Sequence, residues 1–158
     1  MTRIGTSLQG VYCLNYEKLI TEANNNGLKV KEFSIPGYKG RIKGNRIAIR
    51  KDIPPLKEKS CILAEELGHF YTSHGDILDQ KIIANRKQEY RARLWAYDKQ
   101  VGLIRIINAF NAGCQSLYDM AEYLDVSKEF LNRTIKSYRS KYGVFTKVEN
   151  YIIYFEPT

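Results

Sequence analysis

The 158-residue sequence contains no run of the roughly 18 to 20 apolar residues that a membrane-spanning helix needs. Its first residues, Met1 to Leu8, lack the apolar core of a signal peptide. Cysteine is scarce and widely spaced, as Cys13, Cys61 and Cys114, which argues against a disulfide framework and a cysteine-rich zinc knuckle. These absences predict a protein of a reducing compartment, which we take to be the cytoplasm, with no membrane partner.

Internal repeats and low-complexity tracts are also absent, and hydrophobic residues make up 44% of the chain. That composition is typical of a globular protein rather than of a disordered one. The length allows one domain, or one domain with a small appendage, whose core needs no disulfide or metal to support it. The formal net charge of +8 favours encounters with nucleic acid or acidic proteins, although a solvated lysine-rich surface is the simpler explanation.

The hydrophobic pattern changes its period several times, and glycine and proline mark the boundaries. Alternating apolar and polar residues predict short strands, two of them joined by a tight hairpin turn at residues 43–45. Helical spacing predicts helices on either side of these strands. The predicted order is helix 15–26, strands 28–33, 40–42 and 46–50, then helices 54–72, 84–99 and 103–112.

The last third of the chain is predicted to hold a helical pair and a terminal hairpin, namely helices 116–124 and 127–142 and strands 144–147 and 151–155. The whole order predicts an α+β fold, in which a small antiparallel sheet packs on a helical core. We therefore expect a loose lead-in over residues 1–14, a core over 15–112, and a C-terminal region over 113–158 that packs on the core.

One predicted helix carries two carboxylates and an imidazole among apolar neighbours. Residues i and i+4 share a face of a helix, so Glu65 and His69 project together, with Glu66 beside them. Burying unpaired carboxylates costs several kcal/mol, so such groups are usually matched by a cation, and zinc binds both imidazole nitrogen and carboxylate oxygen. The alternative is an ordinary helix, with both glutamates facing solvent and His69 half-buried.

The zincin peptidases share the pattern H-E-x-x-H, in which two histidines bind zinc and the glutamate is the general base. In this frame Glu65 replaces the first histidine, while Glu66 keeps the base position and His69 the second ligand position. Glu89, on the next predicted helix, can add a carboxylate if the two helices lie antiparallel. Alternatively, Glu89 pairs on the surface with Arg93, one turn further along its own helix.

Three segments in this order, 63–77, 85–97 and 121–131, resemble the ImmA/IrrE family of metallopeptidases, in the short form encoded by phages and integrative elements. The resemblance implies a zincin-like core and a cytoplasmic zinc-dependent endopeptidase. For mobile-element members it implies cleavage of the element's own helix-turn-helix repressor, which derepresses the element. It also implies roles for four residues: Glu66 as catalytic base, His69 and Glu89 as metal ligands, and Glu65 in the place of the first histidine ligand.

Glu65 is a departure from the family pattern and leaves two interpretations open. A set of one histidine and two carboxylates is more anionic than a two-histidine set, so it can accept manganese or another divalent ion besides zinc. Alternatively, the substitution abolishes metal binding, and the chain is a catalytically inactive relative that binds a protein or DNA as a regulator. His74 and Asp76, just after the helix, are candidates for an alternative ligand or for groups that support the ligands.

The C-terminal helical pair has a helix-turn-helix-like pattern, and its second helix is basic. With the terminal hairpin as a wing, this region resembles a winged-helix DNA-binding module. We favour the alternative, a helical pair that packs on the catalytic core and contacts substrate, and direct DNA binding is the less favoured prediction. The cations on the second helix are Lys128, Arg133, Lys136, Arg139 and Lys141.

Overall fold

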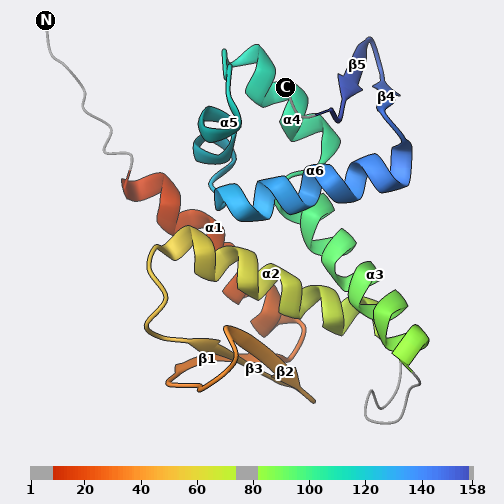
Figure 1. Ribbon diagram of the computed structural model, residues 1–158. Coiled ribbons are helices and arrows are strands. Elements are labelled where there is room, and N and C mark those ends of the chain that lie inside the picture. Colours follow the sequence, from red (N-terminus) through yellow and green to blue (C-terminus); the bar gives the residue numbers. More distant parts are fainter. Residues whose placement is uncertain (1–8, 74–81, 157–158) are drawn as a thin grey trace, which may run out of the picture.

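The computed structural model describes residues 9–73 and 82–156, and it confirms the α+β class with a terminal hairpin. Figure 1 shows the first sheet below α2, with the C-terminal helices and the hairpin above it. Within the described residues, no helix combines the length and the apolar character that crossing a membrane requires. The elements are α1 (Gln9–Asn25), β1 (Lys29–Phe33), β2 (Gly40–Lys43), β3 (Arg46–Arg50), α2 (Leu56–Thr72), α3 (Ile82–Gln100), α4 (Leu103–Asn111), α5 (Leu117–Leu124), α6 (Lys128–Tyr142), β4 (Phe145–Val148) and β5 (Tyr151–Tyr154).

The first sheet is mixed, whereas the sequence predicted an antiparallel one. Its strand order is β1-β3-β2, with β1 parallel and β2 antiparallel to β3. The central place of β3 follows from its composition, because Ile47 and Ile49 are almost completely buried against the helices. The two outer strands carry all the lysines of the sheet, and lysine on an edge strand discourages pairing with other chains.

The first helix and the motif helix begin at residues other than those predicted. The first helix, α1, begins at Gln9 and so includes part of the stretch expected to be a lead-in. The helix that carries the motif, α2, begins at Leu56 rather than at the prolines, because Pro55 is extended at its N-cap. Ser73 ends α2 with an extended backbone, and its N–H donates to the carbonyl of His69.

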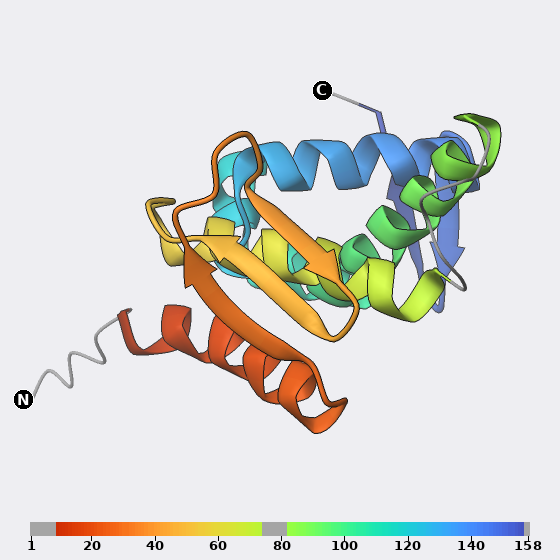
Figure 2. The same ribbon diagram turned by 90° about the horizontal axis from the view of Figure 1, so that it is seen from below.

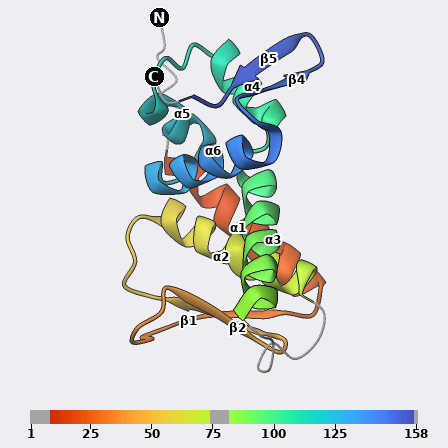
Figure 3. The ribbon, with the colours of Figure 1, turned by 45° about the vertical axis from the view of Figure 1, so that its right-hand side comes forward.

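The two helices α2 and α3 cross at very short range. Gly68 on α2 faces the backbone of Ala92 on α3, and a Cβ atom at Gly68 would lie 2.9 Å from the Ala92 carbonyl carbon and closer still to its oxygen. Only glycine permits this approach without displacing a helix. Figure 3 shows the resulting layers, with the sheet beneath α1 and α2, and α6 above them.

The C-terminal region is attached to the core through α6. Tyr97 on α3 packs edge-on against Phe130, and the hydroxyl of Tyr138 donates to Asp98 over 2.7 Å. Phe155, after the last strand, is buried and lies in ring contact with Tyr138. These contacts hold α6 across α3, so its first turns lie near α2.

The buried position of Asp125 leads us to expect that the free energy of unfolding depends on pH. Asp125 ends α5 in the left-handed conformation, it is buried, and neither carboxylate oxygen has a hydrogen-bond partner among the described residues. Burial, helped by Glu122, raises the pKa of Asp125 to about 6, against the influence of Lys57 and Arg105. Because the folded-state pKa lies above the unfolded one, ionisation lowers stability as the pH rises from about 4 to 6.

Asp125→Asn is therefore expected to raise the free energy of unfolding by about 1 to 2 kcal/mol at pH 7.5, and by much less at pH 4. Asparagine also tolerates the left-handed backbone. Urea denaturation of both proteins at both pH values gives the difference directly. As a control, Asp119→Asn should show no such gain at pH 7.5, because hydrogen bonds from Ser116 and Gln115 lower the pKa of Asp119. An equal effect of Asp125→Asn at both pH values would contradict the assignment.

Candidate active site

The motif side chains occupy the last turns of α2, a helix whose middle turns are buried. Its apolar residues, among them Leu63, Ala64 and Leu67, face the core. Glu65, Glu66 and His69 lie between that core and solvent, all three only partly exposed. The structure therefore does not show the alternative of an ordinary helix with both Glu65 and Glu66 facing solvent.

His69 and Glu89 come together from facing helices. His69 Nε2 lies 3.3 Å from Glu89 Oε2, and the other carboxylate oxygen of Glu89 lies 2.8 Å from Arg93. The structure thus shows both contacts that the sequence offered as alternatives for Glu89: it faces the motif helix, and it pairs with Arg93 on its own helix. The short crossing at Gly68 and Ala92, one residue and three residues away, allows this contact.

Glu65 is turned toward α6. Its Oε1 lies 3.0 Å from Arg133 Nη2, and only 21% of its side chain is exposed. This oxygen accepts no well-aligned hydrogen bond from the described residues, so the ion pair is its main compensation. Burial raises the pKa of Glu65, whereas the guanidinium groups of Arg133 and Arg93 act in the opposite direction.

Glu66 is held against the edge of the sheet. The backbone N–H of Ile42 on β2 donates a hydrogen bond to its carboxylate, which opposes the dominant effect of burial. Burial, with the nearby charges of Glu65 and Glu89, raises the pKa of Glu66 to about 7. Gly40 lets β2 come this close, since a Cβ there would lie 2.5 Å from Ile62 Cγ2 and 3.1 Å from Glu66 Oε1. A carboxyl group whose pKa lies near neutral pH can both accept a proton and return it.

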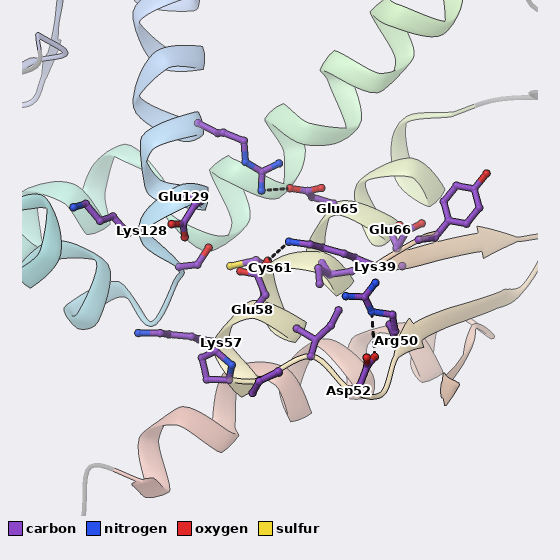
Figure 4. A pocket seen from close by; sticks show the side chains of 18 of the residues that line it. Lys39, Arg50, Asp52, Lys57, Glu58, Cys61, Glu65, Glu66, Lys128 and Glu129 are labelled. Carbon is purple, nitrogen blue, oxygen red and sulfur yellow. Dashed lines mark hydrogen bonds and ion pairs between the residues drawn. The ribbon is translucent and has the colours of Figure 1, made fainter. Parts of the chain in front are cut away.

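Glu65 and Glu66 line a groove of about 950 Å³. Its walls are the segment leading into β2 and the first turns of α6, and α2 forms its floor (Figure 4). A smaller hollow of about 360 Å³, between α3 and α6, contains Glu89. Arg93 and Arg133 line both, so these two side chains stand between the groove and the hollow.

The donor atoms suit a divalent metal in kind. One imidazole and two carboxylates on facing helices match the ligands of zinc and of harder ions, and Glu65 offers a buried oxygen without a well-aligned partner. Across residues 9–73 and 82–156, no three histidine, cysteine or acidic side chains converge on one point. His69 and Glu89 are paired, while Glu65 faces Arg133. His74 and Asp76 lie outside the described residues.

Arg133 and Gly40 are the site residues that sequence reasoning missed. Arg133 was placed on a DNA-facing or packing helix, but it reaches across to the motif. The available signal was Glu65 itself, because a carboxylate on an apolar helix needs a cation. Gly40 carried no signal, since its importance depends on how closely β2 approaches Ile62.

A glutamate-glutamate-histidine motif on one helix faces a carboxylate on the next, in the arrangement that the sequence predicted for a metallopeptidase. The family model for the IrrE N-terminal-like domain (Peptidase_M78) matches residues 13–136. The chain therefore belongs to this family, which confirms the resemblance, supports a metallopeptidase-like function and implies a divalent metal. No curated protein and no solved structure matches the chain.

Proposed function

We propose that this chain is a cytoplasmic metal-dependent endopeptidase that hydrolyses a peptide bond held in the groove beside Glu66. The observation that carries the proposal is the contact of His69 with Glu89, two ligating side chains from different helices, close to a carboxyl group with a pKa of about 7. Membership of a peptidase family supports the same conclusion.

Peptide hydrolysis needs groups that bind the metal and a group that transfers protons, and the site contains residues suited to both roles. A divalent ion, zinc or manganese, supplies Lewis acidity for a peptide carbonyl and for water when it is bound. His69 and Glu89 would hold this ion, and Glu65 would be a third ligand if its carboxylate left Arg133 for the ion. Glu66, oriented by the N–H of Ile42, takes the proton of the attacking water and delivers it to the leaving amine.

We further propose that the substrate is a helix-turn-helix transcriptional repressor of a phage or mobile element, cleaved to derepress that element. The support for this substrate is the family resemblance of the three segments. The groove is compatible with a peptide chain, because it runs along α2 beside β2, which pairs only with β3 among the described strands. An exposed sheet edge can pair with an extended peptide.

One observation favours a second candidate, an inactive relative that acts as a protein- or DNA-binding regulator. Arg133 neutralises the carboxylate that replaces the first histidine, so the motif has an internal cation in the absence of metal. If this ion pair is stronger than metal binding, the groove can bind a protein segment without cleaving it.

Metal titration separates the two candidates. Calorimetry with zinc and manganese is expected to show about one equivalent bound, and His69→Ala should weaken binding by more than about 100-fold, beyond the loss typical of a supporting residue. Arg133→Gln should tighten binding several-fold, because it removes a competing cation and leaves a shorter, uncharged polar side chain. No binding of either metal to the wild type or to Arg133→Gln would sink the peptidase proposal and favour the regulator.

A further inference from the structure

The outer face of the first sheet carries cations in register across all three strands. Lys29 on β1 lies opposite Arg46 on β3, and Arg46 lies opposite Lys43 on β2. One row further along, Lys31 and Arg41 flank Ala48 in the same way. The five cations of these two rows are called the basic face below: Lys29, Lys31, Arg41, Lys43 and Arg46.

The basic face has no acidic counterpart. All five cations are exposed, and none of them forms an ion pair with another described residue. Glu32, the acid of β1, belongs to the opposite face, where Tyr16 and Lys59 donate to it. Like charges directly opposite each other destabilise a sheet, so the rows cost stability, which the attraction of Arg41 to the more distant Glu66 offsets only in part.

The basic face also surrounds a hollow of about 710 Å³. All five cations line it together with apolar side chains, among them Phe33 and Ile35, and no acidic residue contributes to its lining. Phe33 is 51% exposed. The view from below shows that no described helix covers this side of the sheet (Figure 2). A hollow with an apolar floor and a cationic rim fits a ligand that is both polyanionic and partly apolar.

We propose that the basic face binds the phosphate backbone of a nucleic acid. Rows of side chains two residues apart on a strand are separated by about 6.8 Å, which equals the axial rise of two nucleotides of one duplex strand, about 3.4 Å each. Phe33 and the apolar floor can contact sugars and bases beside those phosphates, as aromatic groups do in proteins that bind single strands. A protein segment made only of acidic residues offers the negative charge, but it has no apolar groups to contact Phe33 and the floor of the hollow.

A protective role against strand pairing accounts for the basic face only in part. Lysines on the edge strands β1 and β2 fit that role. Arg46 does not, because it lies on the central strand, where both edges are already paired. The proposal is independent of the peptidase function, and it locates nucleic-acid contact on the sheet rather than on α6.

Fluorescence anisotropy with a labelled oligonucleotide, single-stranded in one arm and duplex in the other, tests the proposal. The double variant Lys43→Glu with Arg46→Glu should lose at least about tenfold in affinity, and its salt slope should fall by about 1.4 for a single strand, since each phosphate contact contributes about 0.7. Its melting temperature should be unchanged or higher, because the carboxylate at position 46 would face Lys29, while those at positions 43 and 46 only replace one like-charge pair by another.

The matched control is Lys136→Glu with Arg139→Glu on α6, which changes the net charge equally and should keep most of the affinity. A loss from the α6 variant that equals or exceeds the loss from the sheet variant would overturn the proposal. So would binding of neither oligonucleotide by the wild type. Equally tight, face-dependent binding of poly-glutamate or of phosphatidylserine vesicles would show that the site selects anions in general and would also overturn it.

Discussion

Replacing Glu66 by glutamine is expected to lower kcat/KM for peptide hydrolysis by about 1000-fold, within the range that a general acid–base residue contributes. Glutamine keeps the length of the side chain and an oxygen that accepts the hydrogen bond from Ile42, so the fold and the groove should persist. It cannot take a proton from water, because its amide is far less basic than a carboxylate. The rate should therefore fall while metal affinity stays within a few-fold of wild type.

The measurement is the rate of appearance of new N-termini in a peptide library, followed by mass spectrometry with zinc or manganese present. Glu58→Gln is a matched control, because Glu58 lines the same groove on the same helix but pairs with Lys39 and lies two turns from Glu66. It should keep most of the rate. Equal activity of Glu66→Gln and the wild type would show that another group is the base.

Much of the candidate site could be located from the sequence because its parts are local. Glu65, Glu66 and His69 lie on one helix, and their mutual placement follows from helical geometry. The meeting of His69 with Glu89 needed one further assumption, an antiparallel second helix, and Gly68 makes that crossing close. The α+β class followed in the same way from local periodicity and turn residues.

The parts that could not be predicted depend on contacts between distant segments. The hairpin of β2 and β3 is local, but the parallel pairing of β1 with β3 joins strands that are not consecutive. Arg133 is separated from Glu65 by the whole of α3, α4 and α5, so no spacing rule connects them. Alternation along a single strand indicates which face is buried. It does not reveal that Lys29, Arg46 and Lys43 form one row.

Gly68→Ala is expected to destabilise the protein by about 3 kcal/mol, at the upper end of the cost of overpacking. Two effects oppose each other. Alanine is the better helix former by about 1 kcal/mol. The added Cβ, however, would lie within 2.9 Å of the Ala92 carbonyl carbon, and a backbone group cannot move aside without its helix. The steric cost is the larger of the two effects, so the substitution lowers the stability of the protein.

The same substitution should also weaken metal binding, because separating α2 from α3 draws His69 away from Glu89. Urea denaturation gives the loss of stability, and calorimetry with zinc gives the loss of affinity. Asn108→Ala, at an exposed position of α4, controls for helix propensity and should be neutral or slightly stabilising. Adding Ala92→Gly should not rescue Gly68→Ala, since the collision is with the carbonyl of residue 92 and not with its side chain. Rescue by that second change would mean that the helices touch through side chains, and the close backbone crossing would then no longer explain how the two halves of the site meet.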